Sequence, residues 1–104
     1  MTVVSLTFHT LNHRQEEWEN YLHTEFPQMI ENLFDVDKYM LADVESEMIA
    51  EGKNTNLLLF FDSVDRRDDF LGIELKNISE RLEQKFGEDV MLFRTLLHPR
   101  NSRI

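Results

Sequence analysis

The run Leu57-Leu58-Leu59-Phe60-Phe61 decides the fold, because it is the longest uninterrupted apolar stretch in the sequence. Side chains along a β-strand alternate between the two faces of a sheet. A strand that is apolar at every position is therefore covered on both faces, as happens at the centre of a sheet. The run is accordingly predicted to be a central strand.

The residues before this run predict a strand and then a helix. Apolar and polar side chains alternate from 3 to 9, which is the period-two pattern of a strand. Asn12 follows where a helix N-cap is expected, since its side-chain oxygen can accept a hydrogen bond from a free backbone amide. Apolar residues at three- and four-residue intervals predict a helix from 13 to 26. Pro27 removes a backbone donor and predicts a kink or a second short helix that ends near residue 33.

The segment between this helix and the apolar run predicts a strand at the edge of the sheet. Residues 36–44 combine apolar side chains with Asp37, Lys38 and Asp43, and charged side chains are typical of edge strands. Residues 45–56 are mostly polar and contain a glycine, so they are interpreted as the connection of a hairpin.

The residues after the run predict a second helix and a last strand. The helix opens at Asp65 and its buried stripe extends to Phe86. Gly87 follows where a helix C-terminus favours a residue with positive φ. Residues 90–97 are the last strand, and residues 98–104 have no periodicity and an early proline, so they are expected to form a disordered tail.

The order of these elements defines the fold class, α+β. The sequence strand, helix, strand, strand, helix, strand is the ferredoxin-like β-α-β-β-α-β arrangement, here a single domain over residues 1–97. In that arrangement the first and third strands lie at the centre of a four-stranded antiparallel sheet. The apolar third strand and the charged second strand fit those positions.

The open face of the sheet predicts an assembly. Two helices can cover only one face, while the apolar third strand sends side chains to both. Large exposed apolar patches usually mark interaction sites. Packing two sheets face to face in an isologous homodimer, a dimeric α/β barrel, solves this problem. The alternative is that a long loop of the same chain covers the face.

Composition excludes several classes of function. The 104 residues carry a formal net charge of -9, which disfavours binding to the phosphates of nucleic acids. There is no cysteine, so disulfides, thiol nucleophiles and cysteine-ligated metals are excluded. No signal peptide or membrane-spanning stretch is visible, and the protein is expected to be cytoplasmic.

Three residues are the candidates for ligand binding. Arg94 stands in an otherwise apolar strand, and a guanidinium there must reach an anion, a carboxylate or water. In one interpretation it binds an anionic ligand in a pocket with His9 or Tyr39 nearby. In the other it pairs with a carboxylate of this subunit or of its partner.

Other residues of interest have simpler interpretations. The histidine spacings match no metal-binding motif, although His23 has Glu19 four residues before it, so no metal and no cofactor are expected. Trp18 lies on the apolar stripe of the first helix and is expected in the core, with a partner for its indole N–H.

The last strand and the residues before it resemble a known family. The segments Lys85-Phe86-Gly87 and Met91-Leu92-Phe93-Arg94-Thr95-Leu96-Leu97 resemble the closing signature of an uncharacterised bacterial family, domain of unknown function 4286. The segment Glu16-Glu17-Trp18, with His23 and Pro27 beyond it, also resembles that family's pattern. The resemblance covers residues 2–97. It implies a dimeric α/β barrel and no particular reaction.

Two functions from different classes remain. The first is a non-catalytic dimeric module that supports assembly or binds a small molecule. The second is a small monooxygenase that shares the dimeric barrel and oxidises an aromatic or haem-like substrate, for which Asn12, Trp18, His9 and Arg94 supply the residue types but not a motif spacing. The first strand is not followed by the glycine-rich loop that an acylphosphatase-like site needs to bind phosphate. The acidic charge disfavours an RNA-recognition surface. The absence of cysteine disfavours a copper chaperone.

Overall fold

The computed structural model describes residues 1–45 and 51–104. Its strands are β1 (Thr2–Thr10), β2 (Lys38–Asp43), β3 (Lys53–Phe61) and β4 (Val90–Leu97). The first helical segment consists of the 3-10 turn η1 (Asn12–Arg14) and the helices α1 (Gln15–Thr24) and α2 (Phe26–Glu31). The second helical segment consists of α3 (Val64–Asp69), the π-helical turn η2 (Phe70–Glu74), α4 (Leu75–Phe86) and the 3-10 turn η3 (Gly87–Asp89).

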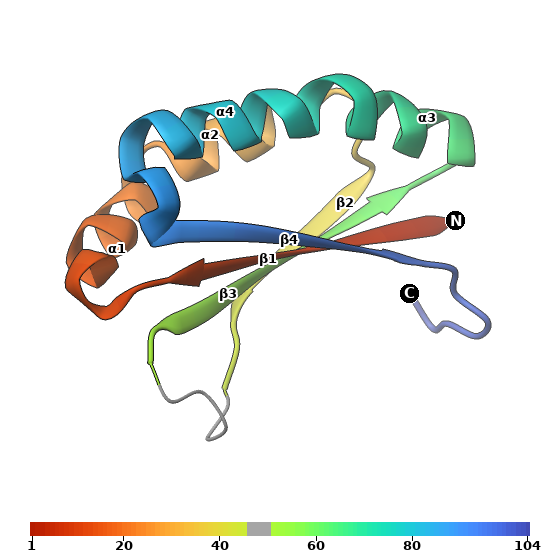
Figure 1. Ribbon diagram of the computed structural model, residues 1–104. Helices are drawn as coiled ribbons and strands as arrows, with labels where there is room; N and C mark the ends of the chain where they lie inside the picture. The colour runs from red at the N-terminus through yellow and green to blue at the C-terminus, as the bar shows by residue number, and fades with distance from the viewer. Residues whose placement is uncertain (46–50) are drawn as a thin grey trace.

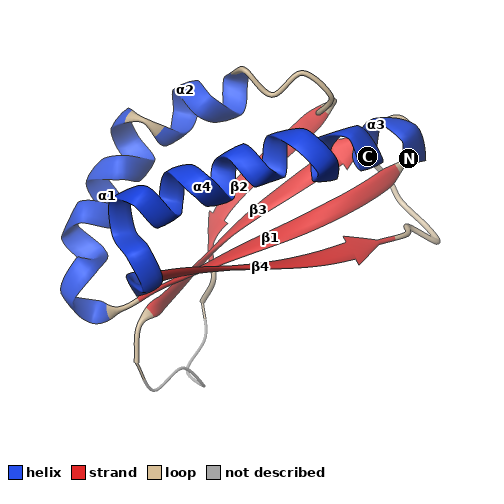
Figure 2. Ribbon diagram, turned by 45° about the horizontal axis from the view of Figure 1, so that its top comes forward, coloured by secondary structure: helices blue, strands red, loops and turns tan. Residues whose placement is uncertain are grey.

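The sheet has the predicted strand order. All neighbouring strands are antiparallel, in the order β2-β3-β1-β4, so β1 and β3 are central and β2 and β4 are the edges. The helices lie together on one side of the sheet, and none of the described residues forms a helix on the other side (Figures 1 and 2). The ferredoxin-like α+β prediction is therefore confirmed.

The core lies between the sheet and the helices. Alternate residues of the central strands, such as Leu6 and Phe8 in β1 and Leu57 and Leu59 in β3, point into it and are fully buried. Trp18 is 1% exposed, and its indole N–H donates to the Thr55 hydroxyl across 3.1 Å. The core placement predicted for this tryptophan is confirmed, and so is its need for a polar partner.

Two local predictions hold because single residues control the backbone. Pro27 stands at the start of α2, directly after the break that separates α1 from α2. Gly87 follows α4 with a φ of 59°, a conformation that side chains with a Cβ rarely adopt.

Two other local predictions are wrong. Residues 53–56 belong to β3 and not to the hairpin connection, whose residues 46–50 lie outside the described part of the chain. Asn12 does not cap a helix, because Leu11 holds the N-cap position of η1. The Asn12 amide oxygen instead accepts from the Gly52 backbone N–H across 3.0 Å and joins η1 to the residue that precedes β3.

Gly52 is predicted to tolerate no side chain. Its φ is 86°, and an added Cβ would lie 2.6 Å from two His9 ring atoms and 2.8 Å from the Thr10 carbonyl oxygen. We expect Gly52→Ala to lower the free energy of unfolding by about 2 kcal/mol or more, measured by urea denaturation. Gly87→Ala, which has positive φ but no neighbouring atom within 4 Å, is the matched control and should cost about half as much. Equal losses for the two variants would contradict the steric part of this prediction.

Arg14 joins the start of α1 to the end of α4. Its guanidinium donates to the Asp89 carboxylate across 2.8 Å and to the Lys85 carbonyl across 3.1 Å, and it lies over the Phe86 ring. The hydrogen bond from Arg14, with a smaller contribution from His13, lowers the pKa of Asp89 below its ordinary 3.8.

This lowered pKa predicts a pH dependence of stability. The unfolded state binds a proton at Asp89 more readily, so the stabilisation is present above pH 3.8 and is lost as the pH falls through the lower folded value. We expect Asp89→Asn to destabilise the protein at neutral pH, with a deficit that shrinks in acid. Urea denaturation at neutral pH and below 3.8 measures this, with Asp69→Asn as an exposed control. A deficit independent of pH would contradict the prediction.

Candidate functional site

The three residues predicted to bind a ligand lie at separate places in one subunit. Arg94 pairs with Leu6 and Tyr39 pairs with Leu59, which puts both on the helix-facing side of the sheet but on opposite edge strands. His9 points to the other side, because it alternates with the buried Phe8 and Thr10. One protomer therefore does not bring the three together.

The polar contacts of two of these residues are local. The Tyr39 hydroxyl donates to the Glu31 carboxylate across 2.5 Å, which raises the pKa of the phenol. His9 Nδ1 lies 2.6 Å from the Asn54 amide oxygen, so a protonated Nδ1 donates to it. Arg94 is exposed and makes no ion pair within residues 1–45 and 51–104.

The space between the sheet and the helices is occupied by aromatic rings. Trp18 lies 5.5 Å from Phe8, 5.6 Å from Tyr21 and 5.6 Å from Phe86, measured between ring centroids. Phe26 closes the cluster with an edge-to-face contact to Phe8. Trp18 thus serves the core, and Asn12 lies outside it in η1.

No metal site is visible in the described part of the chain. The carboxylate of Glu19 lies 3.6 Å from His23 Nε2 on the exposed side of α1, and the described residues contain no group of three or more histidine or acidic side chains that could hold an ion.

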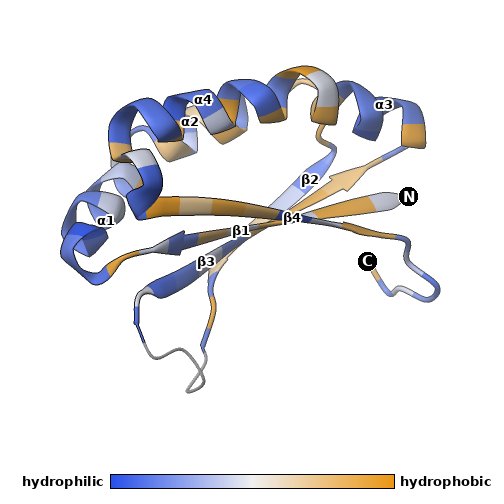
Figure 3. Cartoon of the chain, in the orientation of Figure 1, coloured by the Kyte–Doolittle hydropathy of each residue, from blue (hydrophilic) through white to orange (hydrophobic). Residues whose placement is uncertain are grey.

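The sheet side without helices forms an open face that mixes exposed apolar and hydrogen-bonded polar residues. Phe93 in β4 is 55% exposed and Met40 in β2 is 54% exposed. Figure 3 shows that β4 is hydrophobic along most of its length, whereas α4 is largely hydrophilic. The apolar members of this face, placed by strand register, are Val3, Met40, Ala42, Leu58, Phe60, Met91, Phe93 and Leu97, of which Val3 and Phe60 are already buried in one protomer.

Three polar residues at the centre of the open face are linked by hydrogen bonds. The Asn56 side-chain amide donates to the Ser5 hydroxyl across 2.8 Å and lies 3.3 Å from the Thr7 hydroxyl and from the Leu6 carbonyl. We call Ser5, Thr7 and Asn56 the polar strip. It runs across the two central strands between the apolar residues of the face.

The C-terminal residues lie over one end of the open face. Residues 98–104 form neither helix nor strand and follow β4 beneath the sheet (Figure 1). Pro99 and Ile104 line a shallow cavity of about 310 Å³ together with Val3, Leu58 and Phe60. The opposite half of the face, where Phe93 and Met91 lie, is not part of this cavity.

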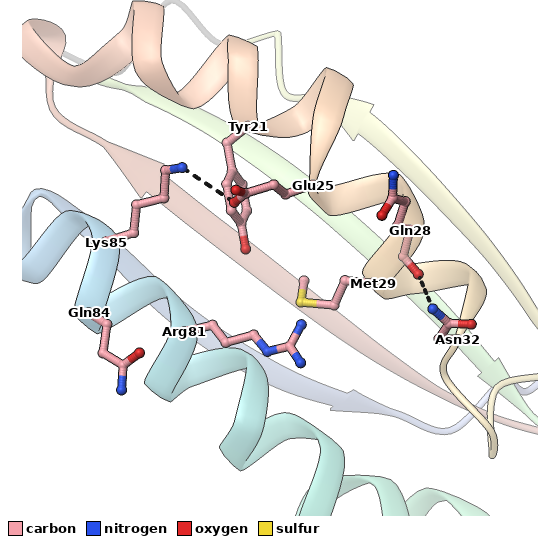
Figure 4. A pocket seen from close by; sticks show the side chains of 8 residues that line it. All are labelled: Tyr21, Glu25, Gln28, Met29, Asn32, Arg81, Gln84 and Lys85. Atoms are coloured by element: carbon pink, nitrogen blue, oxygen red, sulfur yellow. Dashed lines mark hydrogen bonds and ion pairs between the residues drawn. The ribbon is translucent and has the colours of Figure 1, made fainter.

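A groove of about 550 Å³ runs between the two helical segments on the outside of the molecule. It was not predicted from the sequence. Figure 4 shows Tyr21, Glu25 and Met29 on one wall, from α1, α2 and the break between them, and Arg81 and Lys85 of α4 on the other. A smaller hollow of about 250 Å³ continues it past Met29 and Arg81.

An ion pair crosses one end of this groove. Lys85 Nζ lies 3.3 Å from the Glu25 carboxylate and 5.3 Å from the centre of the Tyr21 ring. The ring itself is stacked on Trp18. Tyr21 is thereby held in one orientation, and burial raises the pKa of its hydroxyl, with a further contribution from Glu25.

The described helices include none that is both long and apolar enough to cross a bilayer. This finding covers residues 1–45 and 51–104.

Comparison with known proteins gives one family and a set of similar folds. The model of a family described as "Domain of unknown function (DUF4286)" matches residues 1–99. A search of curated proteins finds no match.

Solved structures share the fold at low sequence identity. A dimeric ferredoxin-like protein from an uncultured marine organism superposes with a TM-score of 0.70 at 14% identity, covering 100% of this chain and 99% of that one. HapK from Hahella chejuensis gives 0.67 at 8% identity, covering 100% and 97%. A mutant of SnoaB, a cofactor-independent oxygenase from Streptomyces nogalater, gives 0.60 at 10% identity, covering 98% and 96%. At these identities the likeness concerns the fold alone.

Proposed function

The chain belongs to the family described as a domain of unknown function (DUF4286), and because that description names no activity we propose a function from the geometry: a non-catalytic homodimeric binding module whose two copies join through the open sheet face. The observation that carries this proposal is the open face itself, on which Phe93 and Met40 are each more than half exposed and Met91 and Leu97 are exposed as well.

Apolar exposure of this kind favours burial against a second copy. Each square ångström of apolar surface removed from water contributes roughly 25 cal/mol. A stable interface buries about 800 Å² on each partner, which is of the order of one face of a small sheet. Two identical faces related by a two-fold axis satisfy each other without any further component.

The polar strip is compatible with such an interface. Buried polar groups are costly when they lose water without gaining a hydrogen-bond partner. Here Asn56 already donates to Ser5 within the same protomer. A second copy can therefore cover the strip without leaving that donor unpaired.

The packing between sheet and helices supports a binding module over an oxygenase. An oxygenase of this architecture would hold its substrate between these layers, where Phe8, Trp18 and Phe26 are fully buried and in contact. These rings already fill the space in which Trp18 would act on a substrate.

Light scattering on the purified protein tests the dimer. We expect twice the protomer mass of 12.5 kDa at micromolar concentration. A mass equal to that of one protomer at every concentration would overturn the proposal. Incubation with haem or an aromatic quinol tests the non-catalytic part, and a change in the absorption spectrum would contradict it.

A further inference from the structure

Arg81 is the charged group that faces the groove without a carboxylate partner in the described part of the chain. The Lys85 ammonium next to it on α4 is already paired with Glu25. Arg81 makes no ion pair with any residue in 1–45 or 51–104, and Figure 4 shows its guanidinium directed into the groove toward Met29. A guanidinium presents N–H donors in a planar fork that matches a carboxylate.

A second donor lies on the opposite wall. In Figure 4 the Tyr21 hydroxyl points into the same groove, and it has no hydrogen-bond partner among the residues that the structure describes. The raised pKa of this phenol keeps it protonated at neutral pH, so that it can donate to an anion. The two donors come from α1 and α4, and both point into the groove.

Beyond these donors the lining is mixed, with an apolar part beside the side-chain amides of Asn32 and Asn77. Met29 and Ile78 pack on the core, and with Leu33 they line the hollow of about 250 Å³ that continues from Arg81. The three apolar side chains give a small organic ligand a surface to pack on, next to the two convergent donors.

We propose that this groove binds a monocarboxylate with a short apolar body, the carboxylate on Arg81 and Tyr21 and the body over Met29, Leu33 and Ile78. A single negative charge fits better than a phosphate dianion, because Glu25 and Glu74 stand at the two ends and the chain carries a net charge of -9.

The inference rests on the proposed function as a binding module, but not on the dimer. The groove is lined by residues of α1, α2 and α4. Figure 2 shows these helices on one side of the sheet, and the open face is the other side. Measuring the mass by light scattering on every sample separates failure of the dimer from failure of the ligand site.

The experiment is a titration of the full chain, followed by the chemical shifts of backbone amides in NMR. Hexanoate is the probe, 1-hexanol is its uncharged counterpart and inorganic phosphate is the anion without an apolar body. We expect saturable shifts with hexanoate, confined to residues of α1, α2, η2 and α4 that line the groove, and at least tenfold weaker binding of hexanol and phosphate, where roughly tenfold corresponds to the loss of one good polar contact. Absence of saturable shifts with hexanoate, or equal binding of hexanol or phosphate, would overturn the proposal.

Variants test the assignment to Arg81 and Tyr21. Arg81 is exposed and makes no ion pair within the described ranges, so Arg81→Gln should leave the fold intact while weakening hexanoate binding at least tenfold. Tyr21→Phe should weaken it by a smaller factor. Arg66→Gln, on α3, removes an exposed arginine away from the groove, whose guanidinium lies 4.0 Å from the Asp35 carboxylate, and it should leave binding unchanged. Unchanged binding in a folded Arg81→Gln protein would refute the site.

Discussion

Phe93→Asp is expected to convert the proposed dimer into a folded monomer. In one protomer the Phe93 side chain is 55% exposed, so its replacement costs the fold only the lower strand propensity of aspartate, about 1 kcal/mol or less. In the proposed dimer the second sheet would cover the same position. A carboxylate there loses its water without gaining a cation, which costs several kcal/mol and weakens association by a hundredfold or more.

Light scattering and circular dichroism together measure this outcome. We expect the mass to fall to 12.5 kDa while the far-ultraviolet spectrum is retained. Ile73→Asp is the control, since Ile73 is 65% exposed but lies in η2 on the helical side, and this variant should remain a dimer. A Phe93→Asp protein that keeps the dimer mass would show that the interface lies elsewhere.

Phe8→Ala is expected to be the most destabilising of the substitutions considered for the protomer. Phe8 is fully buried in β1, with its ring 5.5 Å from the rings of both Trp18 and Phe26. Removing it takes away apolar burial and leaves a cavity that the aromatic neighbours cannot fill. A loss of about 3–5 kcal/mol in the free energy of unfolding follows.

The same substitution at an exposed position provides the control. Phe34 is 82% exposed, and its backbone amide, which donates to the Glu74 carboxylate, ties it to the rest of the protein. Phe34→Ala should therefore change the free energy of unfolding by less than about 0.5 kcal/mol. Urea denaturation of both variants measures these losses. A loss below about 1 kcal/mol for Phe8→Ala would contradict the tight packing of the aromatic core.

The sequence was sufficient for the fold because single residues and simple periods control it. Continuous apolarity placed β3 at the centre of the sheet, Pro27 separated α1 from α2, and Gly87 ended α4. The first four residues of β3 were missed because Asn54 and Asn56 are poor strand formers. They are tolerated there since Asn54 is bonded to His9 and Asn56 to Ser5, and those partners come from β1.

The candidate site was harder to predict, for a physical reason. Arg94, His9 and Tyr39 were grouped by residue type, but strand register and side-chain alternation send them to different edges and faces. The groove was missed because the residues on each side of it have the sequence pattern of the ordinary polar face of an amphipathic helix. Arg81 and Tyr21 meet across it only through the packing of α4 beside α1, which no local pattern specifies.

The completeness of the polar strip has a consequence for the thermodynamics of association. Because Asn56 finds its partners within one protomer, the proposed joining of two open faces is expected to be dominated by the dehydration of apolar side chains. Such association has a negative change in heat capacity and draws its driving force from solvent entropy near room temperature. The dimer should accordingly weaken on cooling and tighten when sulfate is added.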